Sequence, residues 1–170
     1  MAAINGHAYA GGLITALDCD YRVAAEGPYQ FALNEVPIGI PMPAVYVEII
    51  KHALGSAVAH ELTLFGRVYD MEAAVRLGVV RECVFPDQLI PEAIEWAASV
   101  QPDCYVAYAL AKRALQATTM AAIDVAARLD RELLSRGMSH QSSLQANARR
   151  YRELKGRDIT WELPKPDEGR

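Results

Sequence analysis

Several features are scarce in this chain of 170 residues, and each scarcity argues against a class of protein. Its three cysteines, Cys19, Cys83 and Cys104, are odd in number and widely spaced, which argues against a disulfide framework or a paired-cysteine metal site. No run reaches the roughly 18 uninterrupted apolar residues that a membrane-spanning helix requires. The opening segment MAAINGHAYAGG lacks the basic head and long apolar run of a secretory signal. We therefore expect a cytoplasmic protein with no membrane span.

The charge balance gives no sign of a polyanionic partner. The formal net charge is -4, with 52% hydrophobic and 22% charged residues, which is ordinary for a globular domain. We therefore expect no nucleic-acid partner. Arg149, Arg150 and Arg152, followed by Lys155, form a local basic run. Because no basic domain surrounds this run, it indicates an exposed helix end or a subunit contact.

The predicted elements change in character near residue 86. Before it, strands alternate with helices; after it, the pattern is helical only, which predicts an α/β fold with a helical C-terminal region. The expected parts are a core over 1–86, a helical region over 87–156 and a mobile tail over 157–170. Strands are predicted near 2–5, 21–25, 29–33 and 79–84, and helices near 11–17, 44–54, 56–64, 70–77, 88–100, 103–116, 119–136 and 140–155.

A glycine-rich turn joins the first predicted strand to the first predicted helix. The residues there read AINGHAYAGG, so that Gly11 and Gly12 open the helix. Free backbone N–H groups at a helix start favour negative charge, such as a phosphate or a developing oxyanion. The alternative is that these glycines only permit close packing. Their spacing does not match a dinucleotide-binding fingerprint.

Four segments occur in an order that resembles the crotonase, or enoyl-CoA hydratase/isomerase, superfamily. They are AINGHAYAGG, ALDCDYRVA, FALNEVPIG and LTLFGRVYDMEAAVRLGVVRECV, and the resemblance spans about 150 residues. It implies the C-terminal part of a spiral of ββα turns, an acyl-CoA thioester ligand, and a homotrimer or hexamer. It implies no metal, and no cofactor apart from the CoA of the substrate. The first third of the usual domain has no counterpart here, so a separate N-terminal segment is a further expected partner.

The resemblance also assigns roles to individual residues. The N–H of Gly11 would bind the thioester oxygen as it becomes an enolate, and Gly12 would let the helix approach closely. Glu35 matches a catalytic glutamate, whereas Ile14 stands where hydratases carry a second one. One carboxylate is enough to move a proton between two carbons, but water addition normally uses two. Asn34 would orient Glu35 or serve the turn.

The sequence thus predicts an isomerase that shifts a 3-enoyl-CoA double bond to the 2-position, similar to Δ3,Δ2-enoyl-CoA isomerases. From the residues alone, Glu35 is either a solvated loop carboxylate or, among Leu33, Val36 and Ile38, a partly desolvated one with a raised pKa. Lys112 lies in a helix that runs near the CoA nucleotide in relatives, so it would contact a phosphate or face solvent. The alternatives are a hydratase or other crotonase reaction, and a non-catalytic fragment or oligomerisation module.

Overall fold

The first half of the chain forms two small parallel sheets with helices packed against them. The computed structural model describes residues 1–155, so the tail expected over 157–170 lies outside it. Strands β1, β3 and β5 form one sheet in the order β1-β3-β5, with Ala3 opposite Val23 and Ala24 opposite Cys83. The bounds are β1 Ala2–Ile4, β3 Arg22–Ala25 and β5 Glu82–Val84. All four residues of β3 are buried, as expected for the central strand.

A second pair of strands leads directly to the turns of the motifs AINGHAYAGG and FALNEVPIG. Strands β2 (Ala8–Tyr9) and β4 (Phe31–Ala32) are parallel, with Tyr9 opposite Ala32. The first runs into helix α1 (Gly11–Leu17), and the second runs toward the short 3-10 helix η1 (Val36–Ile38). Parallel strands that end side by side bring the segments after them to one edge.

The core lies between these sheets and the helices that follow. Its fully buried side chains include Leu13, Phe31, Leu33, Ile50 and Leu62, which come from helices and strands alike. Helix α2 spans Ala44–Phe65, but Gly55 inside it has φ 77° and ψ 163°, so two helical segments meet at a kink, as the sequence predicts. Helix α3 (Met71–Arg76) begins where the Asp70 carboxylate accepts from the Ala73 N–H at 2.9 Å.

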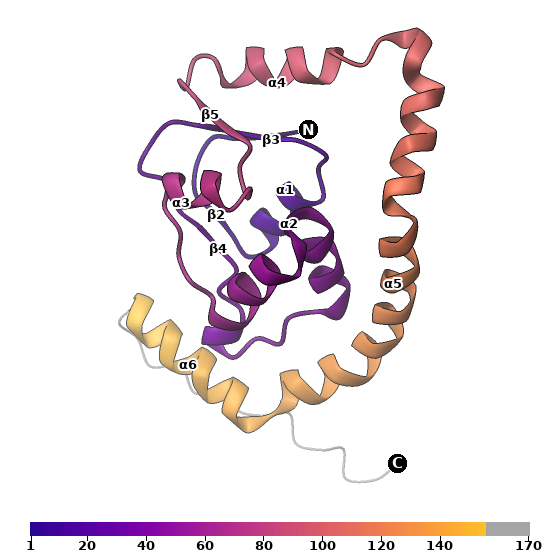
Figure 1. Cartoon of the computed structure of the whole chain (residues 1–170). Helices are drawn as coiled ribbons and strands as arrows, with labels where there is room; N and C mark the ends of the chain where they lie inside the picture. Colours follow the sequence, from indigo (N-terminus) through magenta and orange to yellow (C-terminus); the bar gives the residue numbers. More distant parts are fainter. Residues whose placement is uncertain (156–170) are drawn as a thin grey trace, which may run out of the picture.

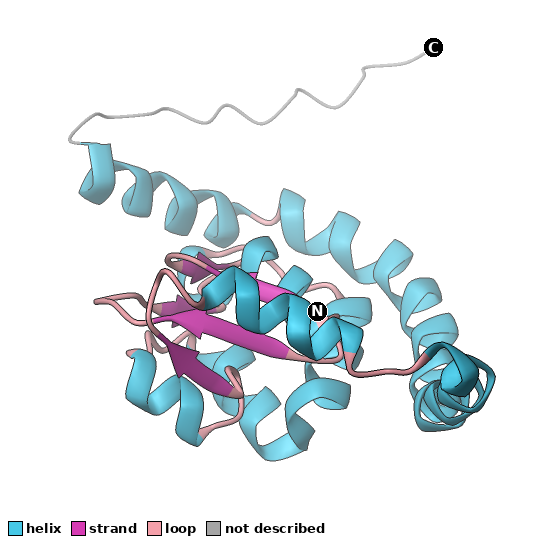
Figure 2. Cartoon of the chain, turned by 90° about the horizontal axis from the view of Figure 1, so that it is seen from above, coloured by secondary structure: helices cyan, strands magenta, loops and turns pink. Residues whose placement is uncertain are grey.

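The second half forms a helical frame around this core (Figure 1). Helix α4 (Leu89–Ala98) crosses one end, the 3-10 helix η2 (Pro102–Cys104) turns the corner, α5 (Tyr105–Ser139) runs along the side, and α6 (Gln141–Lys155) returns beneath. At 1.5 Å per residue, α5 is about 50 Å long. Figure 2 shows the strands lying within the arc made by α5 and α6. The predicted α/β class with a helical C-terminal region is confirmed.

One predicted boundary is wrong. The sequence predicts separate helices over 103–116 and 119–136, but α5 is continuous through this region. Threonines Thr118 and Thr119 lower helix propensity there. Thr119 Oγ1 lies 2.9 Å from His52 Nδ1 on α2, so a tertiary contact favours the continuous helix.

Candidate active site

Gly11 and Glu35 lie in the segments that follow the neighbouring strands β2 and β4, at the same edge of this small sheet. The Ala10 N–H donates to the Ala32 carbonyl at 3.0 Å, which extends the pairing beyond the strands themselves. Gly11 follows this bond directly, and Glu35 follows Ala32 by three residues. Two segments that are 24 positions apart in the sequence are thereby joined at one site.

The turn before Gly11 has an unusual backbone conformation. Ala10 has φ 50° and ψ -129°, and it is the one non-glycine residue with positive φ among the described residues. Such a conformation costs on the order of 1–3 kcal/mol for a residue with a side chain. The Ala10 carbonyl still accepts from the Ile14 N–H at 3.1 Å, so the strained residue is fixed at the start of α1.

The backbone at the start of α1 is open. Within the described part of the chain, no hydrogen bond uses the N–H of Gly11 or Gly12. A Cβ built at either glycine would meet nothing within 4 Å. The close approach expected at Gly12 is therefore not found among the residues described, and close packing inside this chain does not explain the glycine pair. Two N–H groups are left available for a ligand.

Glu35 is a buried carboxylate, with only 8% of its surface exposed. Burial raises its pKa above the ordinary value, and a hydrogen bond with its own backbone partly offsets this. Its Oε2 atom is buried and has no hydrogen-bond partner among the described residues. A carboxylate in this state fits the role of a general base better than that of a solvated loop residue.

The remaining site residues expected from the sequence divide into two groups. Asn34 lies beside Glu35 and lines a cavity of about 320 Å³ together with Tyr9. Ile14 is 5% exposed and belongs to the hydrophobic core. Lys112 lies elsewhere: its Nζ is 2.6 Å from Asp20, a residue beyond the C-terminal end of α1, whereas Gly11 opens that helix.

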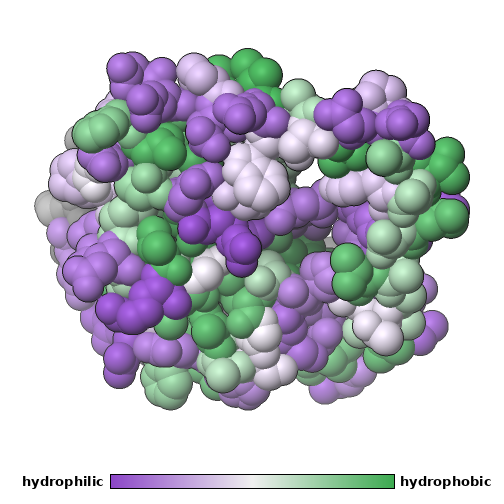
Figure 3. Space-filling view, turned by 45° about the horizontal axis from the view of Figure 1, so that its top comes forward, coloured by the Kyte–Doolittle hydropathy of each residue, from purple (hydrophilic) through white to green (hydrophobic). Residues whose placement is uncertain are grey.

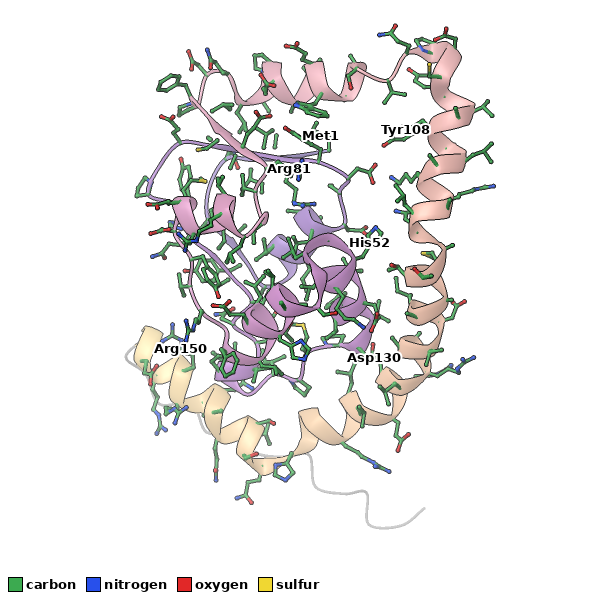
Figure 4. All side chains as sticks on the ribbon, viewed as in Figure 1. Met1, His52, Arg81, Tyr108, Asp130 and Arg150 are labelled. Carbon is green, nitrogen blue, oxygen red and sulfur yellow. The ribbon has the colours of Figure 1, made fainter. Side chains whose placement is uncertain are left out.

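Lys112 takes part in a small polar cluster between α5 and the core. Asp20 also accepts from the Tyr108 hydroxyl at 2.8 Å, and the hydrogen bond to Asp20 raises the pKa of Lys112. The amine is paired with a carboxylate in this structure while 40% of the Lys112 side chain stays exposed, so the phosphate contact at Lys112 stays a prediction. Figure 4 shows Tyr108 pointing from α5 toward the core, on the side where Arg81 and His52 lie.

This cluster borders another cavity, of about 490 Å³, between α5, α2 and the end of α1. Its opening beside α5 is visible in Figure 3. Glu35 does not line it. We place the candidate active site at the β2–β4 edge, because the segments that carry the buried carboxylate and the open N–H groups both begin there, and size alone does not decide between cavities.

The comparisons with known proteins show the family of this chain. Residues 1–162 match the family model described as enoyl-CoA hydratase/isomerase. The chain belongs to this family. The human mitochondrial enoyl-CoA delta isomerase 1 is 29% identical over 161 residues, covering 92% of this chain and 53% of that protein. A probable enoyl-CoA hydratase from Rhizobium meliloti is 31% identical over 133 residues, covering 78% of this chain and 51% of that protein.

Solved structures of the enoyl-CoA hydratase/isomerase family have the same fold. The human mitochondrial delta3-delta2-enoyl-CoA isomerase superimposes with a TM-score of 0.73 at 30% identity, covering 91% of this chain and 61% of that one. An enoyl-CoA hydratase from Mycobacterium tuberculosis gives 0.67 at 31% identity, covering 79% and 62%. The chain spans about half the length of the curated relatives named here.

In the described part of this family member, no helix is long and apolar enough to cross a membrane.

Two residues that line the cavity beside Asn34 were not among the site residues predicted from the sequence. They are Arg149 and Arg150, which are exposed on α6, as expected for an exposed helix end, and which also line this cavity. Their position depends on α6 folding back toward η1, and no local pattern in the sequence predicts that path. The basic run was the available signal, but the sequence did not show which surface it would face.

Proposed function

We propose that this protein binds a fatty acyl-CoA and moves a 3-enoyl double bond to the 2-position. Glu35 takes the proton from the α-carbon, and the electron pair of the broken C–H bond is delocalised to the thioester oxygen. The same carboxyl then returns the proton to the γ-carbon, while the double bond forms between the α- and β-carbons. Atoms and charge balance without a metal or a redox partner.

The observation that carries this proposal is a buried carboxylate, the only one among the described residues, in the segment that follows β4, while the Gly11–Gly12 turn with its open N–H groups follows the neighbouring β2. Burial raises the pKa of Glu35, which makes this carboxylate a stronger base than an ordinary glutamate. The Gly11 N–H is available to stabilise the enolate, and one such donor contributes roughly 3 to 4 kcal/mol to a transition state when water is excluded. Ile14 is an apolar core residue, so α1 supplies no second carboxylate at the hydratase position.

Replacing Glu35 by glutamine tests the proposal. Glu35→Gln keeps the size of the side chain but removes the basic oxygen, so isomerisation should fall by at least about 100-fold. Binding of the acyl-CoA should change little. The assay follows 2-enoyl-CoA formation from a 3-enoyl-CoA, with Glu95→Gln on the exposed side of α4 as the control.

Three results would contradict the proposal. Retained isomerase activity in Glu35→Gln would show that another group carries the proton. Hydration of a 2-enoyl-CoA by the unmutated chain, at a rate comparable to isomerisation, would favour a hydratase. A chain that neither binds nor converts acyl-CoA would favour the remaining alternative, a non-catalytic fragment or oligomerisation module.

A further inference from the structure

The cavity beside Asn34 lies under α6, and we refer to it as the α6 cavity. Tyr9 and Asn34 form one side, Pro37 and Val68 contribute apolar surface, and Arg149 with Arg150 forms the α6 side. Its volume is about 320 Å³, which is within the range of small-ligand sites. Tyr9 precedes Gly11 by two residues and Asn34 precedes Glu35, so the α6 cavity adjoins the candidate active site.

Close packing of α6 on η1 holds the arginines in place. Gly39 follows η1 with φ 77°, and a Cβ there would lie 2.7 Å from the Ala146 Cβ and 2.7 Å from the Ser143 carbonyl oxygen, both on α6. Only glycine allows this approach. The contact between Gly39 and α6, which requires glycine, therefore fixes one boundary of the α6 cavity. Figure 4 shows Arg150 on α6 beside the core.

The polar groups of the α6 cavity leave one positive charge without a partner. Arg150 is 3.1 Å from Glu153, so these two charges compensate each other. The Tyr9 hydroxyl donates to Gln30 at 2.8 Å. Within the described residues, neither the Arg149 guanidinium nor the Asn34 amide has a hydrogen-bond or ion-pair partner. A guanidinium and an amide that face one small cavity match a carboxylate, which accepts several hydrogen bonds.

We propose that the α6 cavity binds a carboxylate at the far end of the acyl group, so that the preferred ligands are thioesters of dicarboxylic acids. This inference rests on the proposed function, which places the thioester at Gly11. Arg149 would pair with the terminal carboxylate, Asn34 would donate a further hydrogen bond, and Pro37 and Val68 would contact the methylene chain. A single uncompensated charge and an apolar wall fit a monoanionic chain end better than the multiply charged phosphates of CoA.

Binding measurements on the whole chain test this without requiring turnover. Isothermal titration compares adipoyl-CoA with hexanoyl-CoA, and suberoyl-CoA with octanoyl-CoA, so that each pair differs in the terminal carboxylate. We expect the carboxylate-bearing thioester to bind about tenfold tighter or more, the usual effect of a charged hydrogen bond. Arg149→Gln should remove most of that preference, and Asn34→Leu should reduce it.

Controls separate this inference from the proposed function. Arg128→Gln changes an exposed arginine on α5 and should leave the preference intact. Circular dichroism verifies that each variant is folded. Equal binding within each pair would overturn the inference alone, and so would an Arg149→Gln variant that weakens all four thioesters alike, which would assign the α6 cavity to the CoA phosphates. Failure of the chain to bind any of the four thioesters would contradict both proposals.

Discussion

At the scale of single residues, Ala10 combines a strained backbone with a fixed position beside the Gly11–Gly12 turn. Glycine has no penalty at φ 50°, so Ala10→Gly should stabilise the chain by about 1 kcal/mol, even after the entropy that glycine adds to the unfolded state. Urea unfolding measures the change. As a control, Ala127→Gly within the exposed part of α5 should lower stability by about the same amount. A destabilised Ala10→Gly variant would contradict the strain at this turn.

Glu35 should also affect stability in a pH-dependent manner. Because its folded pKa is raised above the ordinary 4.5, the folded chain retains this proton at a pH where the unfolded chain has released it. The contribution of Glu35 to stability should therefore be fully present below pH 4.5 and be lost as the pH rises through the folded pKa. Glu35→Gln has no such proton, so its unfolding midpoint should match the unmutated chain at low pH and exceed it at neutral pH. Parallel curves across this range would contradict the raised pKa.

The residues of the candidate site were only partly predictable from the sequence. Motif order identified Gly11 and Glu35, because each lies in a segment whose spacing is set by local turns. Lys112 was assigned by its position on a helix, and its pairing with Asp20 was not predicted. The position of Arg149 beside Asn34 was not predicted either. The contacts of a residue on a long helix depend on packing against segments that are far away in the sequence. The local sequence therefore does not predict these contacts.

At the scale of elements, α2 begins with a cap supplied by another helix. Pro43 precedes it and has no side-chain acceptor, but Asp130 on α5 accepts from the Ala44 and Val45 N–H groups at 2.5 and 3.1 Å. Loss of such a cap costs about 1–2 kcal/mol. Asp130→Ala should therefore lower the free energy of unfolding by this amount, whereas Asp124→Ala on the exposed side of α5 should change it little. Equal effects of both variants in urea titrations would argue against the cap.

Most elements of the first half were predictable, because glycines and prolines mark their ends. Gly55 and Gly78 both adopt positive φ where the sequence indicated a break. The strand expected over 29–33 is reduced to the pair Phe31–Ala32, since only these residues face β2. The continuity of α5 was not predictable, because the contact between Thr119 and His52 depends on the tertiary fold.

At the scale of the whole molecule, α5 exposes more apolar surface than a stable monomer usually shows. Val106, Leu110, Val125 and Leu129 are between 43% and 74% exposed. On the same helix Met120 is exposed as well, whereas Ile123 is half-buried. Surfaces of this kind commonly mark subunit contacts. We expect self-association at micromolar concentration, with a trimer or hexamer as the proposed state.

Light scattering coupled to size-exclusion chromatography measures this self-association. Val106→Glu together with Leu110→Glu should shift the population toward a smaller species, because the charges cannot be buried without partners. Glu95→Gln serves as the control. A folded monomer of the unmutated chain under these conditions would contradict the expectation.

The cap on α2 also bears on the order in which this molecule can be built. Asp130 lies 86 residues beyond Ala44, so the contact closes one of the longest loops in the chain. Contacts of such separation form late, since the loop entropy must be lost first. During synthesis, α2 leaves the ribosome long before the carboxylate that completes it. The half that carries the candidate site is therefore completed only with the helical frame. A nascent chain that stops short of residue 130 lacks the acceptor for the Ala44 and Val45 amides at the first turn of α2.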